Sequence, residues 1–513
     1  MKLNYLEPLS KDEVKIIDSA AIELLSNVGI KVDAESAKNL FIKSGCDVDK
    51  DTNFVKIPES LVKDKLKTVP SSFKLYGSDG KYSFEVNTSS TKFATIGTPV
   101  KIYDPTHKRG IRRTILDDTI QQIKLVDCLE NIVCSHIDVW PNDVKVTALH
   151  AHCIYQWYKN SKKPYGLGCL GKLASQDMMD MLSVIVGGDE ELKKNPRLVG
   201  FMNPTSPLHL PQLMTNGYEI FAKYNQPTII APEAMAGSTA PVTLAGLLAQ
   251  IVAETLAGAV LGQLYNPGSP IFFATVSNTT DMRSGNSAIG AIETGLITAG
   301  MAQMARYYNI PSRGPGGVTD SKVLDIQNGF ERLQTLMLAV QAGINYITCA
   351  GTYEATLVEA LELLVIDDEL ASICLRAMEG IDVNDDTLGL DVIKKVATNP
   401  KKGVTYLSEK HTQKYMKKEL YIPKLIDRNR RTTWRKKGSK DIVERARDRV
   451  NELLKNFIAP DINPDIEAKL LSMINDIEKR SIDLYKEIEG ITADSVSIEH
   501  VEIKSDKESD KKK

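Results

Sequence analysis

Acidic and aromatic side chains recur where short apolar runs of the sequence end. Trp140 and Glu233 lie at the ends of two such runs, and Tyr353 and Glu354 directly follow a third. The face of an aromatic ring attracts an ammonium ion, and a carboxylate neutralises its charge. If these ends meet at one rim, their side chains would suit a cationic, methylated ligand.

Further polar and charged side chains follow other runs of the same kind. They include His209, Asp281, Arg283 and Arg313. Each of these residues, taken singly, can have an ordinary structural role. A Tyr or Trp at the rim can serve core or interface packing, and Glu354 can cap a helix. His209 and His136 can be structural histidines whose hydrogen bonds are made within the fold. The evidence for a site is therefore the collection and not any one member.

The stretch 309–331, "NIPSRGPGGVTDSKVLDIQNGFE", combines glycines with charged residues. It is not a Walker A loop, because Lys322 follows Ser321 instead of preceding it. One interpretation is a connection whose Thr319-Asp320-Ser321 caps the next helix. The other is that Arg313, Asp320 and Lys322 point into a site. A desolvated Lys322 could form a Schiff base, but a neighbour as acidic as Asp320 would keep it charged.

A helical apolar pattern follows this stretch and predicts one buried stripe on the next helix. Its members step by three and four along the chain: Val323, Ile326, Phe330, Leu333 and Met337.

Eight short runs that look buried recur between helical stretches, with a repeat of 30–43 residues. Alternation of apolar and polar residues is mostly absent, as expected of strands covered on both faces. Eight strand-plus-helix units predict an α/β fold, a (β/α)8 TIM barrel, whose chemistry sits on the loops after the strands. An open doubly wound sheet is the alternative, but no G-x-G-x-x-G follows the first strand. The runs are 92–99, 131–140, 164–170, 197–204, 227–235, 270–277, 308–314 and 345–351.

The rest of the chain falls into three further segments around the barrel, which we place at 91–385. Residues 1–90 predict an N-terminal α+β cap of helices and a hairpin around Asp79–Gly80. Residues 386–487 predict a C-terminal helical extension, and 488–513 a charged, disordered tail.

The composition excludes several classes of protein. The 513 residues carry 64 Lys and Arg against 66 Asp and Glu, so no overall field favours nucleic acid or an anionic membrane. No apolar run approaches the roughly 20 residues that span a bilayer, and no signal peptide is evident. The seven cysteines show no metal-ligand spacing, and His150, His152 and Cys153 of "HAHC" are too close together to chelate well. We expect a cytoplasmic protein without a bound metal.

Several long blocks, in order, carry a resemblance to a known family. They include "YDPTHKRGIRRTILDD", "AGSTAPVTLAGLLAQIVAETLAG", "TDMRSG", "GPGGVTDSKVLDIQNGFE" and "PKLIDRNRRTTWRKKGSKDIVERA". The chain, up to about residue 485, resembles the trimethylamine:corrinoid methyltransferase family. The resemblance implies a (β/α)8 barrel that passes a methyl group to Co(I) in a separate corrinoid protein. It implies that cobalamin is supplied by that partner and that no cofactor is bound tightly by this chain.

The resemblance also bears on the substrate. Founding members use pyrrolysine to activate trimethylamine, whereas members without it demethylate quaternary amines such as glycine betaine. This sequence has only ordinary residues in the corresponding loops; residues 318–322 are the segment where pyrrolysine would be expected. We therefore expect the substrate to be a quaternary amine. When it loses a methyl group, the leaving group is a neutral tertiary amine, so no proton donor is needed.

The resulting hypothesis is an in-line displacement at the barrel mouth, with the corrinoid protein docked over the same face. Trp140, Glu233, Tyr353 and Glu354 would surround the ammonium, and Arg313 or Arg283 would meet a substrate carboxylate. Two alternatives stay open: a pyrrolysine-independent enzyme acting on a tertiary methylamine or another methyl donor, and a non-catalytic barrel that binds methylated amines. We also expect a homo-oligomer.

Overall fold

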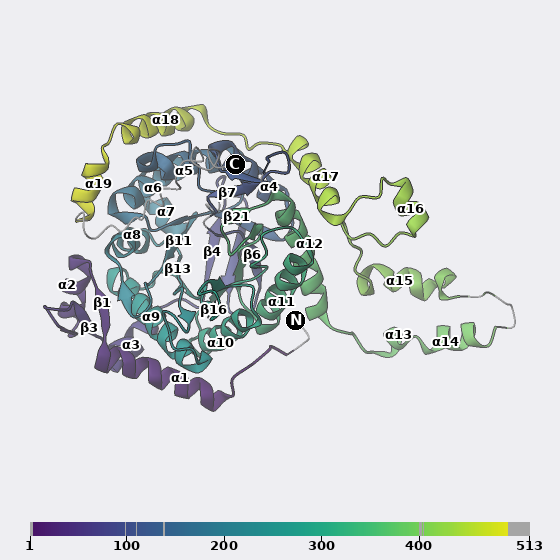
Figure 1. The fold of residues 1–513 in the computed structure, drawn as a ribbon, viewed down its shortest axis with the longest axis horizontal. Helices are drawn as coiled ribbons and strands as arrows, with labels where there is room; N and C mark the ends of the chain where they lie inside the picture. Colours follow the sequence, from purple (N-terminus) through teal and green to yellow (C-terminus); the bar gives the residue numbers. More distant parts are fainter. Residues whose placement is uncertain are drawn as a thin grey trace, which may run out of the picture.

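Eight parallel strands close into a barrel, which confirms the predicted (β/α)8 architecture (Figure 1). The computed structural model describes residues 4–97, 99–108, 110–136, 139–399, 403 and 405–490. Each barrel strand coincides with one of the eight predicted apolar runs. In chain order the strands are β6 (Lys92–Ala94), β9 (Ile132–His136), β10 (Tyr165–Gly168), β11 (Leu198–Met202), β13 (Thr228–Ile230), β15 (Ile271–Ala274), β18 (Ser312–Pro315) and β19 (Tyr346–Thr348).

A helix follows each barrel strand and covers the outside of the barrel (Figure 1). Apolar side chains between these helices and the strands form the main core. The helices are α4 (Leu116–Cys128), α5 (Leu149–Asn160), α6 (Gly171–Val186) with the short α7 (Asp189–Lys194), α8 (Gln212–Lys223), α9 (Leu244–Tyr265), α10 (Ile292–Tyr308), α11 (Ile326–Ala342) and α12 (Leu361–Glu379).

Helix α9 corrects one expectation from the sequence. Its 22 residues are long and apolar enough to cross a membrane by length and composition. Helices α1 (Lys11–Glu23) and α3 (Glu59–Leu66) pack against it on the side away from the barrel strands. Because α9 is covered on both sides, it is apolar all round, as a core helix of a large domain is.

The N-terminal segment contains the predicted helices and hairpin. Ser10 and Glu13 form the capping box of α1, which runs on through a π-helical turn at Leu24–Val28. A small sheet follows, to which β12 of the barrel loops adds a strand parallel to β1. Its members and neighbours are β1 (Ile30–Val32), α2 (Glu35–Lys43), β2 (Asp47–Val48), β3 (Phe54–Lys56) and β12 (His209–Leu210).

The hairpin of β4 (Ser72–Tyr76) and β5 (Ser83–Asn87) fills the N-terminal end of the barrel. The amide of Tyr76 donates to the carbonyl of Pro196, just ahead of β11. The ring of Phe73 meets Phe272 of β15 edge-on at 5.1 Å, and Phe272 lies 5.0 Å from Tyr346 of β19. A column of rings therefore occupies the barrel interior from the hairpin upward.

Loops at the opposite, C-terminal end of the strands form two small sheets. One joins the loops after β13 and β15, and the other joins the loops after β6 and β19. The first contains β14 (Met235–Ala236), β16 (Asn278–Thr280) and β17 (Ser287–Ala288); the second contains β7 (Lys101–Tyr103), β8 (Ile111–Arg113), β20 (Thr352–Tyr353) and β21 (Val358–Glu359).

The C-terminal helices divide into two groups (Figure 1). Helix α17 (Ile442–Lys455) packs on α12 and α4, α18 (Pro464–Glu478) on α5 and α6, and α19 (Ile482–Glu489) on α6 and α8. The remaining helices stand away from the barrel. They are α13 (Asp385–Leu388), α14 (Leu390–Ala397), α15 (Lys410–Glu419) and α16 (Arg431–Lys436). The charged tail predicted from residue 488 onward lies, beyond residue 490, outside the described residues.

The prediction of a buried apolar stripe on α11 was wrong. Ile326 is 85% exposed and Phe330 57% exposed. The inward face is polar in the first half of the helix, where buried Arg332 forms a 2.7 Å ion pair with Asp367 of α12, and apolar in the second half. The cap also differs from the prediction, since Asp325 accepts from the Asn328 amide at the start of α11.

Candidate active site

A cavity of about 560 Å³ lies at the C-terminal end of the barrel strands. This volume is within the range of about 300–1,000 Å³ typical of small-molecule sites. Its lining is largely apolar, with a few polar groups from different strands. The lining includes Ile96, His136, Trp140, Leu167, Leu170, Phe201, Asn203, Met214, Glu233, Met235, Val276, Asn278, Ser287, Ile289, Arg313, Cys349, Ala355 and Thr356.

Glu233 and Arg313 place opposite charges in this cavity. The Glu233 side chain is accessible from the cavity but surrounded by protein, so desolvation raises the pKa of its carboxyl group. The Arg313 cation and a hydrogen bond from Asn203 act against that shift. Arg313 itself is buried; its guanidinium donates to the Thr275 carbonyl at 2.9 Å and lies 5.3 Å from the centre of the Phe201 ring.

His136, at the end of β9, forms part of the cavity floor. Its Nε2 lies 2.9 Å from the Tyr346 hydroxyl, and its backbone amide donates to Thr95 at 2.8 Å. Burial and the nearby Arg313 cation lower the pKa of His136 to about 3, so its ring is neutral near pH 7. Gly166 of β10 is required beside it, because a Cβ there would lie 1.8 Å from the imidazole Nδ1.

Trp140 contributes an aromatic wall from the loop after β9. Its backbone amide donates to the Pro99 carbonyl at 3.2 Å, and its own carbonyl accepts from the Thr114 hydroxyl and, at 3.2 Å, from the Asn142 amide. The buried indole Nε1 has no hydrogen-bond partner within the described part of the chain. Because this atom is buried, it is not a donor exposed to the cavity.

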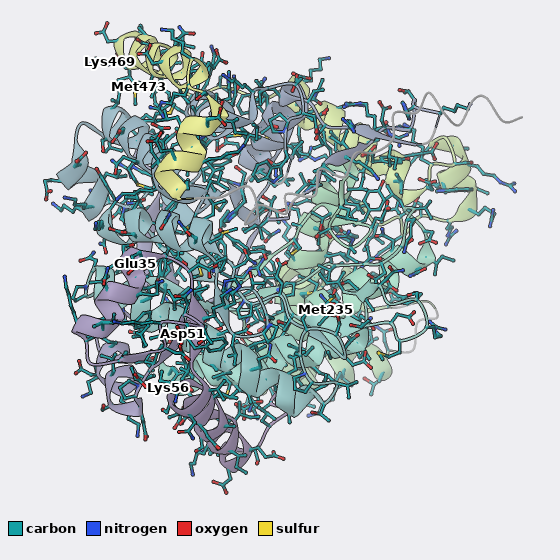
Figure 2. All side chains as sticks on the ribbon, turned by 60° about the vertical axis from the view of Figure 1, so that its left-hand side comes forward. Glu35, Asp51, Lys56, Met235, Lys469 and Met473 are labelled. Atoms are coloured by element: carbon teal, nitrogen blue, oxygen red, sulfur yellow. The ribbon has the colours of Figure 1, made fainter. Side chains whose placement is uncertain are left out.

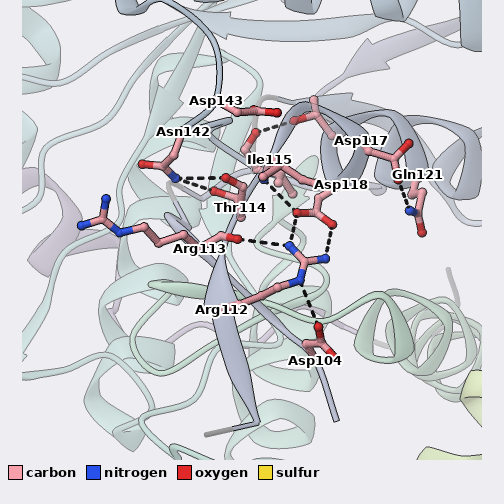
Figure 3. Close-up of polar contacts among 12 residues, drawn as sticks. Asp104, Arg112, Arg113, Thr114, Ile115, Asp117, Asp118, Gln121, Asn142 and Asp143 are labelled. Atoms are coloured by element: carbon pink, nitrogen blue, oxygen red, sulfur yellow. Dashed lines mark hydrogen bonds and ion pairs between the residues drawn. The ribbon is translucent and has the colours of Figure 1, made fainter. Parts of the chain in front are cut away.

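The segment from β8 to Thr114, which bonds the Trp140 carbonyl, is held by Arg112 (Figure 3). Arg112 of β8 forms two 2.7 Å bonds to the carboxylate of Asp118 in the first turn of α4, and a third bond, of 3.0 Å, to Asp104. The Asp118 carboxylate also accepts from the Ile115 amide at 2.9 Å. These bonds fix the segment that presents Thr114 to Trp140.

Four residues lining the cavity have positive φ without being glycine. They are Ile96 (153°), Cys349 (81°), Ala355 (52°) and Thr356 (66°). Such a backbone is uncommon for any L-residue and unfavourable for the β-branched Ile96 and Thr356. Strained residues of this kind are concentrated at ligand sites, where the surrounding structure holds them in place.

The structure brings Trp140, Glu233 and Arg313 together but places Tyr353 and Glu354 outside the cavity. Tyr353 belongs to β20, and its ring is buried in a separate cluster with Val358 and Leu363. Glu354 follows it with a φ of 51°, and its amide donates to the Ser321 carbonyl at 3.1 Å. From this loop, the cavity is lined by Cys349, Ala355 and Thr356 instead.

Asp320 and Lys322 also lie away from the cavity lining. The Asp320 carboxylate accepts from the amides of Ile289 and Gly290, at 3.1 and 2.9 Å. Burial raises the pKa of Asp320 despite these bonds. The exposed Lys322 donates to the Asp320 carbonyl at 2.7 Å and borders a second hollow, beside Tyr103. Asp320 thus joins two loops of the mouth.

The remaining predicted residues form local pairs. Arg283 is 91% exposed and pairs with Asp281 at 2.9 Å, which lowers the pKa of Asp281 to about 2. His209 Nε2 lies 2.6 Å from Asp33, where β12 meets the N-terminal sheet. Neither pair lines the cavity.

Sequence reasoning did not select several residues that line the cavity. Apart from His136, they include Phe201 and Asn203 at the end of β11, Met214 and Met235. In Figure 2, Met235 lies away from Glu35 and Lys56 of the N-terminal segment. Asn203 could have been selected, because it follows a predicted strand directly. The two methionines carried no signal, since an isolated Met in a helix or loop is ordinary packing.

The cavity can bind a small ligand that carries positive charge, negative charge or both. A carboxylate and aromatic rings suit an ammonium, while the Arg313 guanidinium suits a carboxylate. No group of three or more His, Cys, Asp or Glu that could hold a metal ion occurs among residues 4–490 as far as they are described.

Comparison with known proteins gives a consistent picture. The model of the "Trimethylamine methyltransferase (MTTB)" family matches residues 1–483. The chain is 34% identical to "Glycine betaine methyltransferase" of Desulfitobacterium hafniense (strain Y51), over 91% of this chain and 96% of that one. It is 31% identical to "Trimethylamine methyltransferase MttB" of Desulfitobacterium hafniense (strain DSM 10664 / DCB-2), over 92% and 94%. Among solved structures, the Methanosarcina barkeri monomethylamine methyltransferase MtmB aligns with a TM-score of 0.43 at 13% identity, covering 89% of this chain and 96% of that one.

Proposed function

The chain belongs to the trimethylamine methyltransferase family, and from that premise we propose that it transfers a methyl group from a quaternary amine, glycine betaine or a close analogue, to Co(I) of a separate corrinoid protein. The observation that carries this proposal is the presence of Trp140, Glu233 and Arg313 around one cavity at the barrel mouth. A betaine has a quaternary ammonium at one end and a carboxylate at the other. The cavity offers a partner for each.

The proposed positions of the two ends follow from charge. Glu233 and the Trp140 ring would attract the ammonium, and Arg313 would bind the carboxylate. Glu233 and Arg313 interact electrostatically across the cavity, so a zwitterion can satisfy both without leaving a buried charge alone.

The proposed reaction needs no acid or base from the protein. The C–N bond breaks with its electron pair on nitrogen, so the product amine leaves neutral, and the methyl acceptor supplies the pair for the new bond. His136 is neutral near pH 7 and has no proton to transfer as a cation. The work of the protein is to remove water from the ammonium, to hold one methyl group toward the mouth, and to exclude competing nucleophiles.

The cavity opens on the side where the acceptor would approach. Ser287, Ala355 and Thr356 of the mouth loops line its outer part, above the floor at His136. In this proposal, Co(I) on the partner protein is the methyl acceptor and meets the bound amine from that side. Cobalamin is supplied with the partner and not held by this chain.

A second candidate, a tertiary methylamine substrate, is favoured by one observation. Burial raises the pKa of Glu233, and a protonated carboxyl group could supply the proton that a departing secondary amine requires. In that case activity would fall as Glu233 ionises, whereas attraction of a quaternary ammonium requires the ionised form.

The test is methylation of Co(I) cobalamin or a corrinoid protein, followed as loss of the Co(I) absorbance, with glycine betaine, a longer betaine and trimethylamine. We expect the betaines to react and to release the corresponding dimethylamino acid. Reaction with trimethylamine alone would select the second candidate. Binding without methylation of Co(I) would indicate a non-catalytic binding protein.

A further inference from the structure

Between residues 381 and 440, the described residues form a helical arm, which contains α13 to α16 and stands away from the barrel (Figure 1). Among its described residues only Leu425 is buried. Leu425 lies where the arm touches the body, since the adjacent Lys424 amide donates to the Glu369 carboxylate of α12 at 3.1 and 3.0 Å. The rest of the arm, as far as it is described, is without a hydrophobic core.

Large apolar side chains are nevertheless frequent along the arm. Leu407 is 86% exposed and Ile381 75% exposed. Together these side chains expose an apolar area on the order of 1,000 Å², which is the size of a specific protein interface and more than monomeric proteins usually leave in one region. The exposed set is Ile381, Val383, Leu388, Leu390, Ile393, Tyr406, Leu407, Met416, Leu420, Ile422 and Ile426.

The arm helices need packing to be stable. The longest, α15, has 10 residues, and α14 has eight. Isolated helices shorter than about 12–15 residues are marginal in water. The arm's internal contacts include exposed ion pairs such as Lys414–Asp386 at 2.6 Å and Lys395–Glu409 at 2.7 Å. Exposed pairs of this kind contribute little stability.

The charge of the arm indicates what covers it. Residues 381–440 contain 16 Lys and Arg against seven Asp and Glu, a net charge of +9. Because the whole chain has a net charge of −2, the rest of it carries −11. The basic arm and the acidic body of another copy therefore attract each other where they come close, and such complementarity directs association.

We propose that the arm packs against the body of a second copy of this chain. A reciprocal exchange of arms about a two-fold axis buries both apolar surfaces at once and satisfies the charge balance of both bodies. The self-association expected from the sequence thus acquires a specific surface, which is distinct from the barrel mouth and independent of the substrate.

The first test is the molecular mass of the full-length chain by sedimentation velocity. We expect the unaltered protein to be a dimer or a multiple of one, and the combined variant Ile381→Glu, Leu407→Glu and Leu420→Glu to be a monomer. The matched control is Ile458→Glu, which changes a side chain that is 79% exposed but outside the arm. Far-UV circular dichroism and a thermal melt establish that the variants fold.

A second measurement locates the contact. Isotope-labelled and unlabelled copies are mixed until their subunits exchange, and lysines are then cross-linked to carboxylates. We expect links between arm lysines of one isotope and body carboxylates of the other. Three results would overturn the proposal: a monomeric unaltered chain, an oligomer that the arm variant leaves intact, or arm–body links within one isotope alone. A monomeric unaltered chain would indicate that a different protein covers the arm.

Discussion

Replacing Glu233 with Gln changes the charge of the cavity while keeping its shape. The amide is isosteric with the carboxylate and can still bond to Asn203. Arg313 remains in place, so its repulsion of an ammonium is the same in both proteins. The difference in binding therefore measures the attraction between the Glu233 carboxylate and the ligand's positive charge.

The size of that attraction follows from the cavity. A volume of about 560 Å³ corresponds to a sphere with a radius of roughly 5 Å, so an ammonium at its centre lies about 5 Å from a charged wall group. Two opposite charges at that separation interact by about 3 kcal/mol at an effective dielectric constant of about 20. This energy corresponds to a roughly 100-fold weaker dissociation constant for glycine betaine in Glu233→Gln.

Isothermal titration calorimetry at pH 7–8 measures this change, and a ligand that lacks the positive charge provides the control. In 3,3-dimethylbutanoate a carbon atom replaces the quaternary nitrogen of glycine betaine, so shape and carboxylate are kept and the positive charge is lost. We expect its affinity to be unchanged or increased in Glu233→Gln. A change of less than about threefold for glycine betaine, or an equal loss for both ligands, would refute the assignment of Glu233 to the ammonium.

Three further predictions concern neighbouring groups. Trp140→Leu should weaken glycine betaine about 10- to 30-fold by calorimetry, because a desolvated cation–π contact contributes up to about 2 kcal/mol; Trp434→Leu, in the arm, should have no effect. The folded pKa of His136, about 3, lies below its unfolded value of about 6.5, so the unfolded chain takes up a proton first as the pH falls. The free energy of unfolding should therefore drop by about 2 kcal/mol between pH 6.5 and 5. Urea titrations of His136→Gln should lack this part of the pH dependence. Asp118→Asn removes the charge that pairs with Arg112 and should lower the free energy of unfolding by about 2–3 kcal/mol. It should also weaken betaine binding with little change in the methyl-transfer rate at saturation. An unchanged melting temperature would contradict this role of Asp118.

The barrel was predictable because its strands are buried on both faces. Continuous apolar runs that alternate with helical stretches are typical of parallel strands, and eight such units are the number that closes a barrel. The predicted stripe on α11 was wrong because part of the inward face of that helix is occupied by Arg332. Its ion-pair partner, Asp367, is 35 residues away in the sequence, so no local pattern indicates the pair.

The site was predictable only in part, and the limit is set by loop geometry. Trp140 lies four residues beyond the end of β9 and reaches the cavity because Thr114, from the loop after a different strand, holds its carbonyl. Tyr353 lies five residues beyond the end of β19, a similar distance, but it turns away, since pairing with Val358 in β20 and β21 sets its direction. Position after a strand therefore predicts the correct end of the barrel but not which side chains face inward.

The hairpin that closes the bottom of the barrel has a kinetic consequence. With that end filled by Phe73 and the rings above it, the amine, the product and the methyl acceptor of the proposed reaction would share one entrance. The amine must then arrive before the acceptor, and the demethylated product stays until the acceptor withdraws. The proposed reaction would then follow a compulsory-order mechanism, and an excess of methyl acceptor would inhibit it by occupying the entrance before the amine binds.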